Sequence, residues 1–430
     1  MRNVVFASAV GAAALAGLMF GFDTAVVSGV THDVQRLFNL TPAALGVTVS
    51  SALWGTLIGA LFAGAPGDRF GSRDTLRVMA VFYIISGLGS ALAWDWSSLL
   101  VSRFIGGLAI GGSSVLAPVY LSEISPAKRR GALVGLFQLN IVIGILVAYL
   151  SNFIVGQFDL GAAEWRWKFG VTVLPAMLLF VALFFIPNSP RWLAARGRHD
   201  AAKAVLDAIG IDELHAPPAD ADKGKLTLKA HAKPILLAVL IATFNQFAGI
   251  NAILYYLNDI FAAAGYGQVS ADMQAVAIGA TNLLFTLLAM TVIDRLGRKT
   301  LLLIGAVGMT AALSTAALVM FGVLAQSLLL WVLVAFIAFF AFSQGAVIWV
   351  YIAEIFPTPV RARGQSIGSG THWLWNAAIA LVYPSIAAMS KGLPFVFFAA
   401  MMAIQFVVVL FVFPETKGAS LEELEKKLTV

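Results

Sequence analysis

The chain is divided into twelve apolar runs of about 20 residues, and this pattern decides its fold class before any motif does. A run of this length crosses a bilayer as a helix, whereas an outer-membrane strand gives about ten residues of alternating hydrophobicity. Only 12% of the 430 residues are charged, against about 25% in soluble proteins. We therefore predict an all-α integral membrane protein. The expected spans are residues 4–29, 43–66, 75–94, 98–121, 132–157, 166–187, 234–261, 272–293, 300–323, 328–352, 364–387 and 393–413.

The loops between these runs carry a charge bias that predicts the orientation. Most of the 28 lysines and arginines fall on the side that also carries both termini. Loops enriched in Lys and Arg stay in the cytoplasm. We therefore expect cytoplasmic termini and a location in the plasma membrane, which in a bacterium is the inner membrane. No basic patch with interleaved aromatic residues indicates a nucleic-acid partner.

Short motifs recur in the two halves of the chain at a nearly constant offset. The sequence DRFGSR (68–73) after the second span returns as DRLGRK (294–299) after the eighth. Two further pairs, 123–131 with 354–364 and 187–191 with 414–418, follow the same offset closely. Such repetition predicts two six-helix halves, arranged as parallel repeats because six spans return the chain to one side. The expected parts are a bundle over 1–190, a cytoplasmic linker over 191–233 with short helices in a helical stretch over 194–209, a bundle over 234–415 and a cytoplasmic tail over 416–430.

Polar side chains inside the seventh span give the strongest indication of function. Asn245, Gln246 and Asn251 interrupt an apolar run, and hydrocarbon offers their amides no water, so they must face a cavity or a partner. A carboxamide both donates and accepts hydrogen bonds, which suits a neutral ligand built from hydroxyls. Gln246 and Asn251 lie about 140° apart around an ideal helix, so we expect unwinding near Gly249 to aim both at one site. Amides that only join neighbouring helices are the alternative.

Taken together, the motifs of this chain resemble one known family. Each motif is weak alone, but their order and spacing over nearly the whole chain are similar to the sugar porter family of the major facilitator superfamily. The resemblance implies a transporter that moves a monosaccharide by alternating access. Hexoses, pentoses and polyols all suit an amide site, so the sugar stays open. The residues that carry the resemblance are the two DR-x-G loops, 103–107, 187–191, 246–256, Trp349 with 353–357, and 414–418.

The resemblance also implies where the sugar binds. Amides satisfy sugar hydroxyls, and an indole offers a flat apolar face with one donor. Tyr255 and Tyr256 match the family's outer gate, with plain packing as the alternative. The residues at matching binding positions are Gln138, Gln246, Asn251, Asn282, Trp349 and Asn376.

Four positions depart from the family pattern. Asn245 stands where a glutamine is usual, so its shorter reach drops or moves one contact with the sugar. His372 stands where Asn or Gln is commoner, and both packing beside the site and a contact with the sugar stay open. Ala346 replaces a proline that loosens the tenth span, which leaves bending to Gly345. Asn188 replaces a glutamate and so removes one carboxylate from the loop network of the first half.

Charges in the repeated loops lie on the expected cytoplasmic side of both halves. Solvated loop charge is the simplest interpretation, and exposed ion pairs contribute little. Their symmetry favours another one, in which ion pairs latch the cytoplasmic side shut and break when the halves rock. The latch residues would be Asp68, Arg69, Arg73, Glu123, Arg130, Asp294, Arg295, Arg298, Glu354 and Arg363.

One carboxylate lies deep in the first span. Asp23 is a functional candidate because a charge at that depth is costly. Arg103 comes from the same half, and its movement towards or away from Asp23 would load and release a proton. In this family, proton-coupled members resemble the chain in having Asp here. Thr172 matches a glutamate that assists coupling in the bacterial xylose symporter, which argues for weaker coupling or none, and a static ion pair is the alternative.

We therefore expect a transporter that imports a monosaccharide, coupled to a proton. An uncoupled facilitator is the second hypothesis within this class. A transporter-like sugar sensor would carry a long signalling tail, and only a short segment follows the last span. An enzyme is not expected because the five histidines and the absence of cysteine give no catalytic constellation, cofactor site or metal site. The expected partners are the sugar, the proton and the lipid bilayer, with no obligate protein partner.

Overall fold

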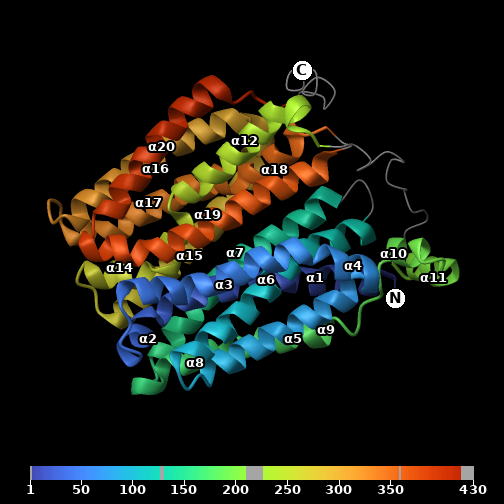
Figure 1. The fold of residues 1–430 in the computed structure, drawn as a ribbon, viewed down its shortest axis with the longest axis horizontal. Helices are drawn as coiled ribbons and strands as arrows, with labels where there is room; N and C mark the ends of the chain where they lie inside the picture. The colour runs from blue at the N-terminus through green and yellow to red at the C-terminus, as the bar shows by residue number, and fades with distance from the viewer. Residues whose placement is uncertain (1, 126–129, 210–225, 358–359, 418–430) are drawn as a thin grey trace. The chain divides into compact units, whose positions relative to one another are not determined.

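The computed structural model describes residues 2–125, 130–209, 226–357 and 360–417. Regular structure in these residues is helical throughout, which confirms the predicted class (Figure 1). The chain forms two compact units, unit 1 over Met1–Ala216 and unit 2 over Pro217–Val430. Each unit therefore has its own helical core.

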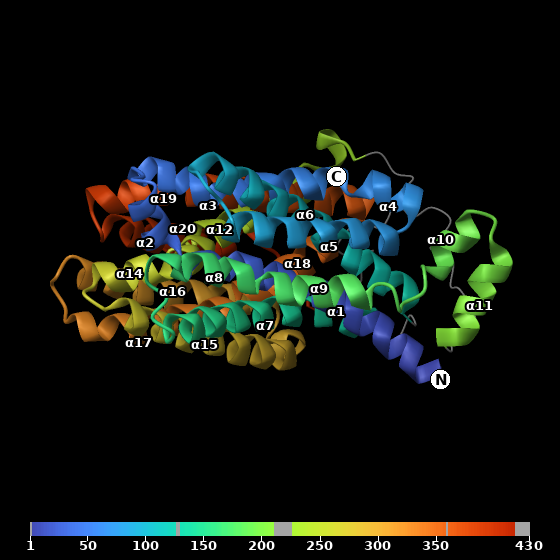
Figure 2. The same ribbon diagram turned by 90° about the horizontal axis from the view of Figure 1, so that it is seen from below.

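Unit 1 is built from long helices joined by short ones, and α3, α5 and α6 run side by side in both Figure 1 and Figure 2. Its helices are α1 (Arg2–Val26), α2 (Thr31–Leu37), α3 (Pro42–Phe62), α4 (Gly64–Phe70), α5 (Ser72–Ala91), α6 (Trp96–Ile124), α7 (Arg130–Gly156), α8 (Glu164–Val171), α9 (Val173–Ala182), α10 (Pro190–Ala195) and α11 (His199–Ile209).

Unit 2 repeats this plan with more broken helices. Its helices are α12 (Leu228–Phe247), α13 (Ile250–Tyr255), α14 (Leu257–Ala263), α15 (Gln268–Leu296), α16 (Arg298–Met320), α17 (Leu329–Phe342), α18 (Gln344–Ile355), α19 (Arg361–Met389) and α20 (Leu393–Val412).

Ten helical stretches in the described residues are long and apolar enough to cross a bilayer. They coincide with ten of the twelve expected spans. The expected third and eleventh spans correspond to α5 and α19, which are long helices of lower hydropathy outside those ten. Both carry polar side chains that the next subsection places in hydrogen-bonded clusters.

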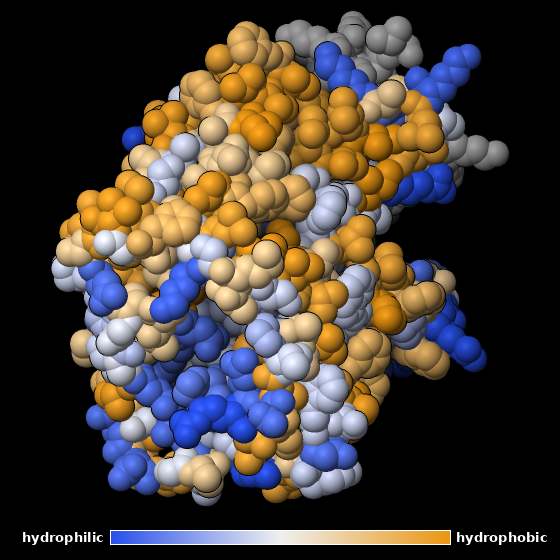
Figure 3. All heavy atoms as spheres, turned by 60° about the vertical axis from the view of Figure 1, so that its left-hand side comes forward, coloured by the Kyte–Doolittle hydropathy of each residue, from blue (hydrophilic) through white to orange (hydrophobic). Residues whose placement is uncertain are grey.

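The outer surface of the helices is apolar. On α9, Leu174, Leu178 and Val181 lie on one face at spacings of four and three, and that face is exposed. Broad apolar areas, orange in Figure 3, cover a large part of the face shown, beside areas of hydrophilic residues. Without a bilayer such a surface would be an aggregation hazard, so these faces are the ones that contact lipid.

Close helix contact depends on glycine at a few positions. A Cβ on Gly107 of α6 would collide with the carbonyl oxygen of Ala52 on α3, and one on Gly21 of α1 would collide with that of Ile141 on α7. Backbones can approach this closely only where no side chain intervenes. The two helix pairs that hold Asp23 and Arg103 are thereby fixed at short distance.

The stretch 194–209 contains the expected short helices, because α10 ends at Ala195 and Gly197 adopts a φ of 72° before α11 begins. One expectation about helix continuity is wrong. The tenth span breaks at Ser343 (φ −117°, ψ −87°) rather than at Gly345, which lies inside α18. The Ser343 hydroxyl donates to the carbonyl oxygen of Phe339 at 2.6 Å while its N–H turns to Phe340, and this side-chain competition opens the helix.

Candidate functional site

A break in the seventh span brings the predicted amides together. The helix α12 ends at Phe247, Gly249 adopts a φ of 83°, and α13 begins at Ile250. A side chain at Gly249 would be strained at this φ and would overlap the ring of Phe398. The break re-aims the chain so that Asn251 Nδ2 donates to Gln246 Oε1 at 3.0 Å. The expected unwinding near Gly249 is therefore confirmed.

Gln246 is the centre of the resulting amide cluster in unit 2. It is 1% exposed. Its Nε2 donates to Asn245 Oδ1 at 3.1 Å and lies 3.1 Å from Nδ1 of His372 on α19. All polar atoms of this glutamine therefore have partners within unit 2, and a ligand that binds here must replace some of them.

Aromatic rings border the amide cluster. The ring of Trp349 on α18 lies 5.1 Å from that of His372, tilted by 55°. Tyr255 and Asn376 exchange hydrogen bonds at 3.1 Å. Polar groups with an adjoining indole face are the combination that binds a hydroxylated ring.

The two predicted gate tyrosines are buried in different surroundings. Tyr255 reaches the cluster through Asn376, whereas Tyr256 donates to the carbonyl oxygen of Ala380 at 2.7 Å. The ring of Tyr256 stacks on Tyr383 with centroids 5.0 Å apart. Tyr256 is therefore part of the packing between α13, α14 and α19.

The other two residues of the predicted binding set are Asn282 and Gln138. Asn282 is buried on α15, and among the described residues no hydrogen bond joins it to the cluster around Gln246. Gln138 lies on α7 of unit 1. Their predicted role stays a prediction.

Asp23 and Arg103 form a buried ion pair in unit 1. Arg103 Nη1 donates to Asp23 Oδ1 at 2.8 Å and Nη2 donates to Oδ2 at 3.0 Å. Their side chains are 2% and 5% exposed, respectively. The ring of Phe169 lies 5.3 Å from the guanidinium carbon. The two-point geometry between α1 and α6 is strong and depends on the planar guanidinium.

In unit 2 the charged residues at the α15 to α16 turn form one network. Arg298 donates to both carboxylate oxygens of Glu354, at 3.2 and 2.8 Å, and also contacts Asp294 at 3.0 Å. Thr416 donates to Glu354 at 2.6 Å. The carboxylate of Glu415 accepts the backbone N–H of Arg298 at the start of α16, where the helix dipole favours negative charge. Three predicted latch residues therefore meet within unit 2.

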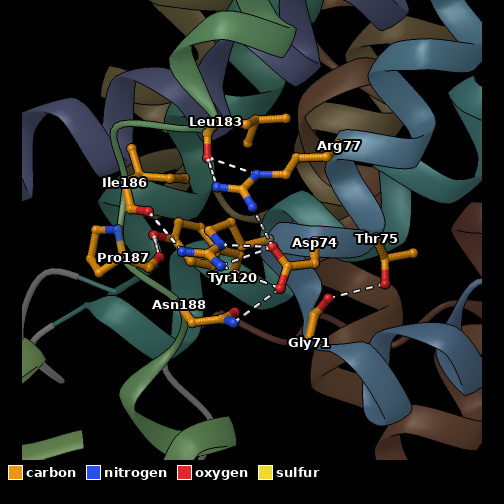
Figure 4. Close-up of polar contacts among 10 residues, drawn as sticks. Gly71, Asp74, Thr75, Arg77, Tyr120, Leu183, Ile186, Pro187 and Asn188 are labelled. Carbon is orange, nitrogen blue, oxygen red and sulfur yellow. Dashed lines mark hydrogen bonds and ion pairs between the residues drawn. The ribbon is translucent and has the colours of Figure 1, made fainter. Parts of the chain in front are cut away.

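The matching end of unit 1 is organised around Asp74, which the sequence analysis did not select. Asp74 lies in the first turn of α5 and accepts from Arg73 at 2.9 Å and Arg77 at 2.8 Å. Asn188 Nδ2 donates to it at 3.3 Å, and Figure 4 shows these groups converging on the carboxylate. Asn188 stands where the family has a glutamate, and in this chain Asp74 brings a carboxylate to the same group of side chains.

Both units close the same turn with matching hydrogen bonds. In unit 1, Arg77 donates to the carbonyl oxygen of Leu183 and Tyr120 donates to that of Pro187 at 2.8 Å (Figure 4). In unit 2, Lys299 and Tyr351 donate to the carbonyl oxygens of Leu410 and Pro414, at 2.8 and 3.2 Å. The two tyrosines and the accepting carbonyl groups follow the sequence repeat, whereas the basic donor does not, because Lys299 matches Arg73 in the repeat and not Arg77.

The other predicted latch residues make different contacts within their own units. Glu123 accepts a hydrogen bond from Ser189. Asp68, Arg69 and Arg295 contribute backbone carbonyl oxygens to Arg196 and Lys417. Arg363 is exposed, and the side chain of Arg130 lies outside the described residues.

Three buried polar contacts escaped the sequence analysis. Asn258 donates to Asp272 between α14 and α15, and Gln344 donates to Gln405 at 2.7 Å. Lys168 is fully buried in α8, where it pairs with Glu164 at 2.7 Å. The signal was present, because each is a polar residue in or beside an apolar run, but the partner could not be identified from the sequence.

Comparison with known proteins agrees with this architecture. The family described as "Sugar (and other) transporter" matches residues 9–428. The arabinose-proton symporter of Bacillus subtilis is 35% identical over 96% of this chain and 93% of its own length. The D-xylose-proton symporter of Escherichia coli is 33% identical over 96% of this chain and 94% of its own. The glucose transporter GlcP of Staphylococcus epidermidis is 36% identical over 96% of this chain and 95% of its own length.

Solved structures give the same result. The xylose transporter XylE from E. coli in a partially occluded inward-open conformation has a TM-score of 0.86 and 31% identity, covering 97% of this chain and all of that one. The XylE structure bound to 6-bromo-6-deoxy-D-glucose has a TM-score of 0.81 and 32% identity, with both chains covered in full. The chain therefore belongs to the sugar transporter family of the major facilitator superfamily, as a multi-pass membrane transporter and not an enzyme.

Proposed function

We propose that the protein imports a monosaccharide by alternating access, in symport with a proton. The observation that carries the coupling is the buried pair of Asp23 and Arg103 in unit 1. The arabinose and xylose relatives are described as proton symporters, which supports the same assignment.

The sugar site proposed is the amide cluster of unit 2. Gln246, Asn251 and Asn376 offer donors and acceptors, and Trp349 offers an apolar ring face beside them. Asn245, His372 and Asn282 would complete this site within unit 2. A hydroxyl of the sugar exchanges hydrogen bonds with the amides one for one, so binding loosens the internal contacts of the cluster.

Coupling would follow from movement of the guanidinium. While Arg103 donates two hydrogen bonds to Asp23, the guanidinium compensates the charge of the carboxylate. When Arg103 moves away, an unpaired carboxylate in this dry environment takes up a proton rather than stay charged. Its return expels the proton, so one proton is carried for each cycle.

The orientation proposed places both termini in the cytoplasm, in the plasma membrane. The turns closed by Asp74 and by Arg298 with Glu354 would then face the cytoplasm. Each network lies within its own unit, so the latch between the two halves stays a prediction.

A competition panel identifies the substrate. The parent protein in proteoliposomes is given labelled D-xylose or D-glucose, with unlabelled hexoses, pentoses and polyols as competitors. We expect one monosaccharide class to compete at low concentration. If no sugar competes or is taken up, the sugar assignment is wrong.

A second experiment tests coupling through Asp23. Asp23→Asn should abolish uphill uptake driven by a pH gradient while sugar counterflow persists, because exchange needs the sugar site without net proton movement. Asp159→Asn is the matched control, since Asp159 is exposed and its φ of 48° suits asparagine equally well. Accumulation by Asp23→Asn would contradict coupling, and a parent that never accumulates sugar would be a facilitator.

A further inference from the structure

The buried hydroxyls of unit 1 fall into two groups. Most donate to a carbonyl oxygen three or four residues back in their own helix, as Thr56, Ser102 and Ser113 do. Ser86, Ser90 and Thr172 differ, because in the described part of the chain their hydroxyl oxygens have no hydrogen-bond partner. All three are at most 1% exposed. A buried hydroxyl left without a partner is costly, so these three require an explanation.

Ser86 lies next to the ion pair, and Ser90 and Thr172 lie along the same stretch of α5. Ser86 and Ser90 are one turn apart on α5, so they share a face. The point where a Cβ on Gly106 would stand is within 4 Å of both Ser86 Oγ and Asp23 Oδ2. Thr172, at the junction of α8 and α9, borders the same stretch of α5 beside Gly87. Glycine at 106 thus keeps the space between Ser86 and Asp23 open.

Arg103 carries a fourth polar atom of this kind. Its two Nη atoms bind Asp23, but its Nε has no partner among the described residues. A small cavity of about 10 Å³ in unit 1 is bordered by Arg103, by Thr31 and Thr48, and otherwise by apolar residues such as Phe169. This volume is at the lower limit for one water molecule, and Ser86, Ser90 and Thr172 are not among the residues that line the cavity.

We propose that Ser86, Ser90, Thr172 and Arg103 Nε hold water molecules that conduct protons between Asp23 and the end of α5 that carries Ser90. The proposal rests on the proton symport proposed above and adds the route by which the proton arrives. Ser90 lies in the last turn of α5, one turn beyond Ser86, so the route is short.

The chemistry of the path is simple proton exchange. A hydroxyl both accepts and donates, so it holds a water in either orientation. At each step an O–H bond breaks on one oxygen and forms on the next, and the last transfer converts the carboxylate of Asp23 to the neutral acid. Nothing else is consumed, and the pH gradient supplies the direction.

The experiment measures proton entry and sugar exchange separately. Proteoliposomes contain a pH-sensitive dye, and labelled D-xylose or D-glucose, whichever the parent transports, is the probe. We expect Ser86→Ala with Ser90→Ala to slow sugar-induced proton entry about tenfold, because a positioned proton relay contributes at least this much. Counterflow should stay within about twofold of the parent, because exchange needs no proton movement. Ser51→Ala with Ser151→Ala is the matched control, since both hydroxyls bond to their own helix.

A pair of substitutions at Thr172 separates the hydroxyl from its volume. Thr172→Val keeps the shape and should slow proton entry, whereas Thr172→Ser keeps the hydroxyl and should not. The path is overturned if protons enter at the parental rate in Ser86→Ala with Ser90→Ala and in Thr172→Val. It is also overturned if counterflow falls as much as proton entry in these variants, because that would mean a packing role. Failure of symport itself is read from Asp23→Asn, so the two proposals are tested independently.

Discussion

Gln246 Nε2 lies 3.1 Å from Nδ1 of His372, so the amide at the centre of the cluster is held by the imidazole. Because the amide nitrogen donates, the ring nitrogen that accepts carries no proton. Gln246 Nε2 also donates to Asn245 Oδ1, and Gln246 Oε1 accepts from Asn251 Nδ2. These contacts fix the orientation of Gln246 before a sugar arrives.

Removing Gln246 should weaken sugar binding without unfolding the protein. Gln246→Ala deletes an amide donor and acceptor that water does not replace in a buried site, which costs about 1–3 kcal/mol of binding free energy. Titration of the purified protein measures it, with the exposed Gln157→Ala as control. Parental affinity in Gln246→Ala would move the binding site elsewhere.

Two substitutions at His372 separate a hydrogen-bonding role from packing. His372→Asn keeps an acceptor for Gln246, whereas His372→Phe keeps the ring beside Trp349 and removes the acceptor. We expect the affinity for the sugar, measured by titration of the purified protein, to fall more in His372→Phe. The difference should be about 1 kcal/mol of binding free energy, for the lost hydrogen bond. The reverse order would mean that the ring contact matters more.

The broken helix makes a prediction about stability. Gly249→Ala must hold a φ of 83° and displace the ring of Phe398, which should cost about 2–4 kcal/mol from strain and overpacking together. Gly322→Ala is the control, because its φ is 75° and no atom lies near its Cβ position. In detergent, the thermal unfolding midpoint of Gly249→Ala should lie well below that of Gly322→Ala. Equal midpoints would mean that the overlap with Phe398 costs no stability.

The class of the protein and the break at Gly249 could be predicted because each follows from one-dimensional information. Apolar run length determines spans, and two amides five residues apart cannot face one site on an intact helix. The pairing of Asp23 with Arg103 was also predictable, since few charges lie within the spans of the first half.

The rest depended on contacts between distant residues. Nothing in the local sequence pairs Asp74 with Asn188, because they meet only after α9 returns beside α5. The break at Ser343 was missed because it arises from a hydroxyl that competes for a backbone carbonyl, and most serines in helices do this without breaking them. Burial of Lys168 likewise required the position of Glu164 and of the Gly29 carbonyl oxygen.

The ion pairs of Arg298 should differ in value according to exposure. Glu354 is bound at two points and is 24% exposed, whereas Asp294 is 83% exposed. Glu354→Gln should therefore lower the free energy of unfolding by about 1–3 kcal/mol, since it weakens two charged hydrogen bonds to a buried guanidinium. Asp294→Asn removes a solvent-screened contact of the same arginine and is the matched control. Equal effects on the unfolding midpoint would mean that the Glu354 pair is no stronger than loop charge.

Exchanging Asn188 and Asp74 tests whether the two units share one design. Asn188 Oδ1 lies 2.8 Å from the position of a Cβ on Gly71, as Glu415 Oε2 lies 2.6 Å from that on Gly297. Asn188→Glu alone sets a second carboxylate against Asp74 and should lower the unfolding midpoint, by roughly 1 kcal/mol because the site is partly solvated. Adding Asp74→Asn removes the repulsion and leaves a carboxylate at the start of α5, as in unit 2, so stability should return towards the parent. A double variant no more stable than Asn188→Glu would mean that Arg73 and Arg77 require the carboxylate at position 74 itself.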